Sequence, residues 1–289
     1  MAGKRQRGGR TRTPDAVTAQ VAGGAAALVP DRERAHAWAL VVEGAPQSHV
    51  DLAAPDHLGF SYQRRLGHVI DLVAPPGMPL RVLHLGGGAL TLARYTAYTR
   101  PRSTQQVIEL DGELVDLVRT HLPWDRGWRI KVRGGDARAG LAKLPDSWAD
   151  LVIADVFGGA RTPAHLTSAE FLTAVRRVMR PGGDYAANLT DGGTLAFLRG
   201  QVATVRAAFT EVCLAADPAV LRGRRFGNAV LWAADHDLPV ADLTRRVATD
   251  PHPGRVEHGQ SLTAFTGGAQ VVTDATATPS PPPPPDAFG

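Results

Sequence analysis

The sequence lacks most of the features that mark secreted, membrane-spanning or metal-clustering chains. Its one cysteine, Cys213, excludes an internal disulfide framework and any zinc site built from a cysteine cluster. No apolar run approaches the roughly 18 residues that a membrane helix needs. The Ala-rich stretch 17–29 contains Gln20 and two glycines, without a secretory cleavage pattern. Because the histidines and acids also show no metal-ligand spacing, we expect a cytoplasmic protein with no membrane partner and no metal.

Acidic residues are missing from the first 12 residues, where five basic side chains contribute +5: Lys4, Arg5, Arg7, Arg10 and Arg12. The whole chain carries a formal charge of +4, which leaves −1 for the remaining residues. The part that folds is therefore not basic overall, and we expect no specific nucleic-acid partner. Residues 1–34 show no clear periodicity and are predicted to form a disordered basic leader.

The most informative feature present is a glycine-rich turn. The apolar run 81–85 predicts a strand, a helical pattern covers 90–98, and three glycines lie between them: Gly86, Gly87 and Gly88. Glycines let the backbone pass close to a ligand where a Cβ would clash. The next predicted strand, 106–110, carries Glu109 about 20 residues past the turn, where a carboxylate can accept hydrogen bonds from both ribose hydroxyls. The pattern predicts an adenosine-containing cofactor.

Two more acids follow the next two predicted strands. Asp136 comes after strand 129–133, and Asp155 comes directly after strand 150–154. In an open parallel sheet, ligands bind at the carboxyl ends of the strands. A single acid at such a position is often a helix N-cap or a solvated loop residue. Three acids after three successive strands favour a ligand site at that edge of the sheet.

Strands and helices alternate through the central part of the chain. Further strands are predicted at 184–189, 211–216 and 227–234, and further helices at 112–121, 137–143, 168–179 and 194–208. Such alternation predicts an α/β fold with a doubly wound, mainly parallel sheet. Because no obvious helix separates the last two strands, they predict an antiparallel hairpin at one edge.

Four segments differ in composition and pattern. The basic leader (1–34) precedes a small β-rich N-terminal extension (35–76), in which two β-rich runs flank a Gly/Pro turn. An α/β domain covers 77–236. Residues 237–289 predict a C-terminal helix and a Pro-rich disordered tail, which contains five consecutive prolines at 281–285.

The motifs resemble a known superfamily. The glycine turn, E-L-D at 109–111, G-D-A at 135–137, a strand ending in Asp155 and R-P-G-G at 180–183 occur in the order typical of the S-adenosylmethionine-dependent, class I methyltransferase-like fold. The triple glycine, the β-rich region before the core, Q-S-H-V-D at 47–51 and F-S-Y-Q-R-R-L-G-H-V at 60–69 are more similar to the spermidine synthase (polyamine aminopropyltransferase) family. The resemblance covers roughly residues 38–235.

The resemblance implies roles for particular residues. It implies that the glycine turn and Glu109 bind the nucleoside, that Asp136 with Ala137 contacts the adenine amino group, and that Asp155 helps to activate the attacking amine. The implied co-substrate is S-adenosylmethionine or its decarboxylated form. The implied partner is a small-molecule amine or similar nucleophile, and a homodimer stays open as an expectation.

Three positions depart from the family pattern. Ala89 stands where G-G-G-D-G has its acid, Arg64 replaces the acid of Y-H-E, and Gly158 replaces the second acid of D-S-S-D-P. The family uses such acids to hold ammonium groups, and an ammonium buried without a counter-charge is costly. We therefore expect putrescine to be a poor acceptor. A methyltransferase that uses S-adenosylmethionine, or a nucleotide-binding homologue without catalysis, remains the alternative.

Other polar residues have structural or supporting roles in this interpretation. Thr167 and Glu170 fit the S/T-x-x-E capping box before an apolar helix. His84, inside the first strand of the α/β domain, is predicted to be a hydrogen-bonded core residue. Three side chains are candidates for lining or closing the acceptor pocket: His165, Tyr62 and His68.

Overall fold

A computed structural model gives the fold and describes residues 15–285, so the five basic side chains of the first 12 residues lie outside the described part. The first half contains β1 (Val17–Val21), β2 (Gly24–Pro30), β3 (Ala37–Val42), β4 (Ala45–Asp51), α1 (Ser61–Leu72), β5 (Arg81–Leu85), α2 (Thr91–Thr99), β6 (Thr104–Glu109), α3 (Gly112–His121), β7 (Arg129–Gly134), α4 (Ala137–Leu141) and β8 (Ala149–Ala154). The second half contains η1 (Ala164–Leu166), α5 (Ala169–Val178), β9 (Met179–Asp191), α6 (Ala196–Ala208), β10 (Glu211–Ala216), α7 (Pro218–Leu221), β11 (Gly227–Ala234), α8 (Val240–Thr249), β12 (Arg255–His258) and α9 (Gly259–Thr266).

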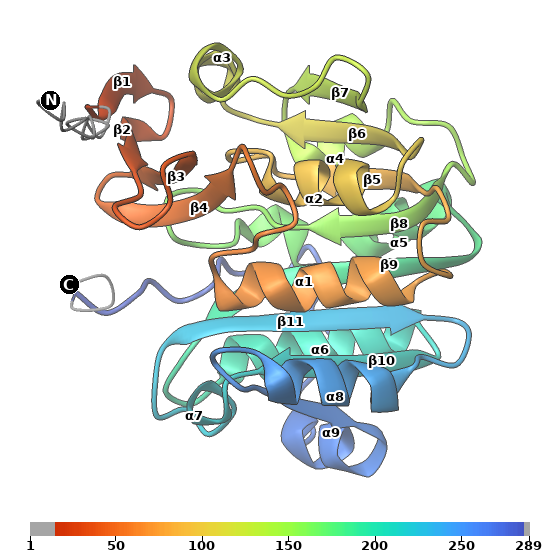
Figure 1. Cartoon of the computed structure of the whole chain (residues 1–289). Helices are drawn as coiled ribbons and strands as arrows, with labels where there is room; N and C mark the ends of the chain where they lie inside the picture. The colour runs from red at the N-terminus through yellow and green to blue at the C-terminus, as the bar shows by residue number, and fades with distance from the viewer. Residues whose placement is uncertain (1–14, 286–289) are drawn as a thin grey trace, which may run out of the picture.

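The larger of two sheets has the strand order β12-β10-β11-β9-β8-β5-β6-β7 (Figure 1). Strands β5 to β9 pair in parallel, whereas β11 runs antiparallel between β9 and β10. This confirms the predicted doubly wound sheet and its antiparallel hairpin. The hairpin does not form the edge, however, because β12 adds to β10 in antiparallel register. The short helix α7 also lies between β10 and β11, where none was predicted.

Helices cover both faces of this sheet. On one face α1, α2 and α8 pack against the strands, and on the other face α4, α5, α6 and α9 do so (Figure 1). The central strands β5 and β8 are apolar along most of their length because both of their faces are buried. Strand β9 begins earlier than predicted, at Met179. Gly182 has φ +74° within this early segment, and pairing with β8 becomes continuous only from Asp184.

The smaller sheet has the order β1-β2-β3-β4 and is antiparallel throughout. The predicted hairpin of the β-rich extension is β3–β4, and its turn residues Glu43 and Gly44 both have positive φ, which suits the twist of a two-residue hairpin. The smaller sheet lies at the ends toward which the arrows of β6 and β8 point (Figure 1). It therefore covers the carboxyl edge of the larger sheet, where the predicted site lies.

The prediction of a disordered leader through residue 34 is wrong for residues 17–30, which form β1 and β2. Strand β2 is rich in alanine, which is depleted in strands, whereas the two valines and the threonine of β1 are ordinary strand residues that the prediction overlooked. Pairing with β3 and burial of Ala26 and Leu28 against Leu40 stabilise β2. Asp111, the N-cap of α3, also accepts the Gly23 N–H at 2.8 Å, which ties the β1–β2 turn to the larger sheet.

The prediction of a disordered tail after the C-terminal helix is also wrong for the residues that the structure describes. Beyond α8, strand β12 joins the larger sheet and α9 packs against α6. The extended segment that follows is held by hydrogen bonds: Val272 accepts from the Ala169 N–H at 2.9 Å, and Ser280 is fully buried. Irregular segments of this kind have no periodicity, so pattern analysis cannot find them. No helix within 15–285 is both long and apolar enough to cross a membrane.

Candidate active site

The glycine turn links β5 to α2 at the carboxyl edge of the larger sheet. Gly86 has φ +87°, and a Cβ there would lie 2.1 Å from the carbonyl oxygen of Asp155. Gly88 has φ +48°, and its Cβ would lie 2.5 Å from Ser48 Oγ on β4. The glycines are therefore required by the close approach of the β8 loop and of the smaller sheet, in addition to any ligand.

Glu109, at the end of β6, faces this turn. Its Oε2 accepts the Gly87 N–H at 2.7 Å and the Gly88 N–H at 3.3 Å, and its Oε1 accepts the Asp111 N–H at 3.1 Å. A carboxylate offers about four lone-pair sites, so one site on Oε1 stays available. The glycine turn and this carboxylate thus form one preorganised unit.

A cavity of about 470 Å³ lies over these groups, and we call it the strand-tip cavity. It is lined by every residue that the sequence placed in the site: Gly86, Gly87, Gly88, Glu109, Asp136, Ala137 and Asp155. Leu40 and Val42 of β3 contribute its opposite wall. Leu110 also lines it and is 70% exposed, an unusual position for a leucine. The cavity therefore combines carboxylates at the strand tips with an apolar surface.

Asp136 has a structural role in addition to its place in this cavity. Its Oδ1 accepts the Ala139 N–H at 2.9 Å and thereby caps α4, and its Oδ2 lies 2.7 Å from His165 Nε2. Burial alone would raise the pKa of Asp136, but these hydrogen bonds hold that pKa below its ordinary value. His165, which the sequence made a candidate for the acceptor pocket, lines the strand-tip cavity together with Asp136.

Asp155 follows β8 and has the most perturbed environment of the three acids. Burial raises its pKa to about 6; the Asn188 amide, which donates to Oδ1 at 2.9 Å, opposes that rise, and the nearby charge of Glu109 adds to it. The carboxyl is thus close to the protonation balance that suits a general base near neutral pH. Asn188, on β9, was missed by the sequence analysis although it also lies near a strand tip.

A second cavity of about 540 Å³ lies beside the first, and we call it the arginine-lined cavity. Gln47 and Phe157 line both cavities, and Asn188 joins them through its bond to Asp155. Tyr62, whose hydroxyl donates to the Gln47 carbonyl at 2.9 Å, forms part of the wall of the second cavity. The charged lining residues of the second cavity are Arg65, Arg224, Arg225 and Asp217.

Arg65 is the buried member of that set. Its side chain comes from α1 and is 1% exposed, and its Nε has no hydrogen-bond partner. Burial lowers its pKa, while the charges of Asp250 and Asp217 oppose that effect. Asp217 itself is paired with Arg225 at 2.9 Å. No hydrogen bond or ion pair joins the Arg65 guanidinium to any residue within 15–285.

The three positions that depart from the family pattern lie apart from one another. Ala89 is fully buried against the smaller sheet, and its N–H points to Ser48 Oγ at 3.3 Å. Arg64 turns away from both cavities and donates to the carbonyls of Leu58 and Gly59 at 2.6 and 2.8 Å. Gly158 lies in an exposed loop at the strand-tip cavity. The neighbouring Arg65, and not Arg64, lines the second cavity.

Two secondary predictions are corrected and one is confirmed. Ser168, not Thr167, caps α5 by accepting the Phe171 N–H. Glu170 instead accepts the Asp274 N–H from the tail. His68 bonds to Asp250 at 2.9 Å near the end of α8 and does not line either cavity. His84 is confirmed as a core histidine, because it contacts Gln105 at 2.8 Å and burial lowers its pKa to about 4.

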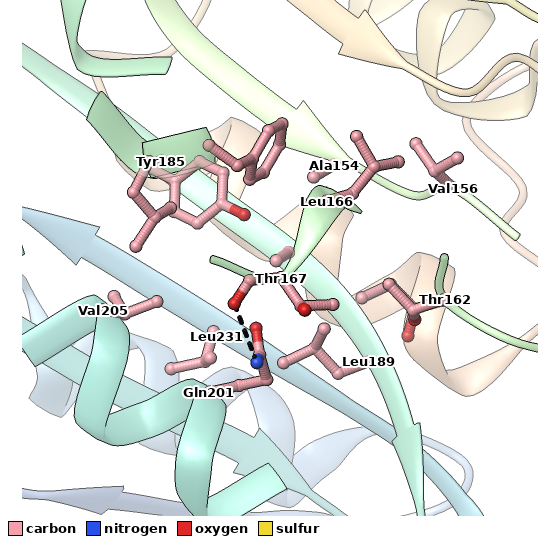
Figure 2. Close-up of a pocket in the computed structure, with 14 residues that line it drawn as sticks. Ala154, Val156, Thr162, Leu166, Thr167, Tyr185, Leu189, Gln201, Val205 and Leu231 are labelled. Atoms are coloured by element: carbon pink, nitrogen blue, oxygen red, sulfur yellow. Dashed lines mark hydrogen bonds between the residues drawn. The ribbon is translucent and has the colours of Figure 1, made fainter. Parts of the chain in front are cut away.

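A small internal cavity lies beneath the loop that follows β8 (Figure 2). Its volume of about 20 Å³ leaves room for about one water molecule. Gln201 donates to the Thr167 carbonyl at 3.0 Å across it, and Tyr185, Leu166 and Val205 form apolar walls. This space belongs to the packing that supports Asp155 and Asn188 from behind, and it is too small for a substrate. No group of three or more metal-ligating side chains is found in the described chain.

Comparison with known proteins gives consistent matches. Residues 59–228, more than half of the chain, match the family model of the spermine/spermidine synthase domain. A polyamine aminopropyltransferase of Vibrio vulnificus is 27% identical over 142 residues, which cover 48% of this chain and 46% of that protein. A polyamine aminopropyltransferase of Aeropyrum pernix is 32% identical over 131 residues, which cover 43% and 41%. The chain thus spans less than half the length of these curated relatives.

Among solved structures, a probable spermidine synthase from Corynebacterium glutamicum is 34% identical, with a TM-score of 0.84 over 90% of this chain and 97% of that chain. The spermidine synthase from Thermotoga maritima is 16% identical, with a TM-score of 0.60 over 86% and 83%. At that identity, the second likeness shows the fold alone. It agrees with the arrangement of a four-stranded sheet set before a methyltransferase-like sheet.

Proposed function

The chain belongs to the spermine/spermidine synthase family, and from this premise we propose that it transfers an alkyl group of the aminopropyl type from a sulfonium nucleotide to a small amine or similar nucleophile. The donor is decarboxylated S-adenosylmethionine or S-adenosylmethionine itself. The observation that carries the proposal is the position of Asp155. It lines the strand-tip cavity and, through Asn188, meets the arginine-lined cavity.

The strand-tip cavity is suited to the nucleoside. Its volume of about 470 Å³ lies within the usual range for small-molecule sites. The available lone pair on Glu109 Oε1 accepts one ribose hydroxyl. The second ribose hydroxyl competes with the Gly88 N–H for Glu109 Oε2. The Gly88 bond, at 3.3 Å, is the longer of the two backbone bonds to that oxygen. The exposed Leu110 gives the base an apolar surface, and Asp136 accepts from its amino group.

Asp155 acts on the nucleophile in this proposal. When bound, a sulfonium nucleotide supplies a carbon that an amine attacks as the carbon–sulfur bond breaks and its electron pair stays on sulfur. Asp155 accepts the proton that the amine nitrogen loses as its new carbon–nitrogen bond forms. Asn188 holds the carboxylate in place, because its amide donates to Oδ1 at 2.9 Å. Gln47 and Phe157, which line both cavities, frame the passage between donor and acceptor.

One observation favours the methyltransferase alternative. Ala89 stands where the family pattern places an acid beside the glycine turn, and its side chain belongs to an apolar core cluster. The chain therefore has no carboxylate at that position to distinguish the decarboxylated donor from S-adenosylmethionine. The departing nucleoside differs between the two reactions, so the product identifies the donor.

The test is a comparison of the two donors with a panel of amines, followed by mass spectrometry of the nucleoside product. We expect 5′-methylthioadenosine from the decarboxylated donor, and its loss in the Asp155→Asn variant. S-adenosylhomocysteine formed from S-adenosylmethionine would instead establish the methyltransferase alternative. If calorimetry shows nucleoside binding while neither product forms with any amine, the chain is a nucleotide-binding homologue and the proposal is wrong.

A further inference from the structure

The charge of the arginine-lined cavity is opposite to what a diamine requires. Its lining contains three arginines, Arg65, Arg224 and Arg225, and one acid, Asp217. That acid is already paired with Arg225 and also caps α7 by accepting the Ala219 N–H. A cation placed there would meet arginines rather than an available carboxylate. The surplus positive charge therefore points to a ligand of the opposite sign.

Arg65 is the residue on which this argument depends. Arg224 and Arg225 are exposed, so water and salt weaken their effect. Arg65 is 1% exposed and has no hydrogen bond or ion pair within the described chain, so the charges of Asp250 and Asp217 act on it only from beyond ion-pair distance, and its Nε lacks any partner. Burial of a charge without a partner is expensive. An arginine that is buried, unpaired and part of a cavity wall is most simply explained by a ligand that pairs with it.

From these observations we propose that the arginine-lined cavity binds an acceptor whose far end carries an anionic oxyacid group, a carboxylate or a phosphate, with Arg65 as the residue that recognises it. This proposal rests on the proposed function, in which the acceptor's amine lies at Asp155. The planar guanidinium presents a fork of donors that matches two oxygens of either oxyacid. The acceptor is thus an amine at one end and an anion at the other.

The walls of the cavity fit the part of such a molecule that joins its two ends. Apolar atoms come from Phe157, Phe226, Val220 and Pro284. The cavity reaches from Asn188, beside Asp155, to Arg65 and Asp217. A short alkyl chain between an amine and an oxyacid group therefore has an apolar path with a suitable polar partner at each end.

Calorimetry at pH 8 with four probes tests this proposal: 4-aminobutanoate, 3-aminopropylphosphonate, putrescine and butylamine. Each probe is titrated into the protein with and without saturating 5′-methylthioadenosine. We expect at least one of the two oxyacid amines to bind 10-fold or more tightly than putrescine and butylamine. The better of the two identifies the oxyacid. The proposal is overturned if putrescine binds as tightly as both oxyacid amines, or if neither oxyacid amine binds.

Variants assign the effect to Arg65. Arg65→Met should weaken the better oxyacid amine by about 10- to 150-fold, the value of a charged hydrogen-bonding site, and should leave putrescine binding equal or stronger. Arg222→Met is the matched control, because Arg222 is exposed and lines neither cavity. Arg65→Lys retains the charge without the fork and should give an intermediate loss. An unchanged oxyacid affinity in Arg65→Met overturns the assignment.

The outcome is separable from that of the proposed function. Absence of a thioether nucleoside product, or of nucleoside binding, would overturn the transferase proposal. The ranking of the four probes by affinity in nucleoside-free protein would still show whether the arginine-lined cavity prefers an anionic or a cationic group. Conversely, a turnover assay that shows efficient transfer to putrescine would keep the transferase and remove the anionic acceptor. If Arg65→Met does not fold, the probe ranking with the wild-type chain and the Arg65→Lys result carry the test.

Discussion

The two adjoining cavities satisfy their charged groups in different ways. In the strand-tip cavity each acid already accepts hydrogen bonds from the protein: Glu109 from the glycine turn, Asp136 from the first turn of α4, and Asp155 from Asn188. In the arginine-lined cavity the buried Arg65 has no such partner among the described residues. The fold therefore supplies hydrogen-bond partners to the first set of charges, whereas in the second cavity it supplies one to Asp217 but none to Arg65.

This difference predicts how substitutions in the two cavities act. The strand-tip acids are fixed by the backbone that forms the sheet edge, so a change there disturbs the turn as well as the ligand. The arginine-lined cavity is lined by residues of β4, α1, the loop after β8, β9, α7 with the loop after it, β11 and the tail. We expect substitution of its side chains outside the strands, such as Arg65, to alter the ligand without altering the sheet.

The largest effect is expected where the two cavities meet. Asp155→Asn keeps the shape of the side chain but cannot accept a proton, so turnover should fall by about 10²- to 10⁴-fold, the usual contribution of a general base. Nucleoside affinity should change far less, because Glu109 and Asp136 remain. The measurement is single-turnover product formation at saturating donor. A loss below 10-fold would show that Asp155 is only a structural acid.

A smaller effect is expected for Glu109→Gln, which tests the strand-tip cavity, where the glycine turn holds the carboxylate in place. The amide replaces one acceptor oxygen with a donor beside the Gly87, Gly88 and Asp111 N–H groups, so nucleoside affinity should fall by about 10- to 150-fold. Glu113→Gln is the matched control, since Glu113 is exposed in the first turn of α3. Calorimetry with 5′-methylthioadenosine and S-adenosylhomocysteine measures both variants. Equal affinities would remove Glu109 from the site.

The sequence predicted the residues of the strand-tip cavity better than those of the arginine-lined cavity. Glu109, Asp136 and Asp155 were found because parallel strands bring their carboxyl ends to one edge, a rule that needs no side-chain detail. Asn188 obeys the same rule and was overlooked. Arg65 left a weaker signal, a cation that shares the buried side of α1 with the apolar Leu66. Which cavity it reaches depends on packing between distant segments, and spacing along the chain does not encode that.

The errors at the two ends of the chain have different causes. Strand β1 pairs with β2, and the alanine-rich β2 pairs in turn with β3. The tail is held through backbone groups, as in the Ser280 N–H donating to the Thr162 carbonyl at 3.0 Å. The tail is stabilised by partners far away in the sequence, which local propensity does not reveal, whereas the β1–β2 hairpin is local and was overlooked.

The tail offers a prediction that separates the two cavities. Ser280 Oγ accepts the Thr162 N–H at 2.9 Å, and Pro284 lines only the arginine-lined cavity. Ser280→Ala leaves a buried N–H unsatisfied, which should cost about 1–3 kcal/mol of stability. Acceptor binding should weaken while nucleoside binding stays unchanged. Thr278→Ala, at an exposed tail position, is the control. Equal losses for both ligands would contradict this separation.

The smallest expected effect concerns stability and distinguishes a functional acid from a structural one. Burial raises the pKa of Asp155 from 3.8 to about 6, so the folded state binds a proton more readily than the unfolded state between these values. Stability attributable to this group therefore decreases as pH rises from about 4 to 6, and the penalty persists above pH 6. Asp155→Asn removes the penalty and can keep the Asn188 contact. Its free energy of unfolding should thus exceed that of the wild type by about 1 kcal/mol at pH 8, after allowance for partial exposure, and equal it near pH 4.

Urea unfolding of both proteins at pH 4 and pH 8 measures this difference in the free energy of unfolding. The titration of the other acids contributes equally to both proteins and therefore cancels in the difference. If Asp155→Asn is instead the less stable protein at pH 8, the carboxylate contributes to the fold, and its raised pKa is no sign of a catalytic role.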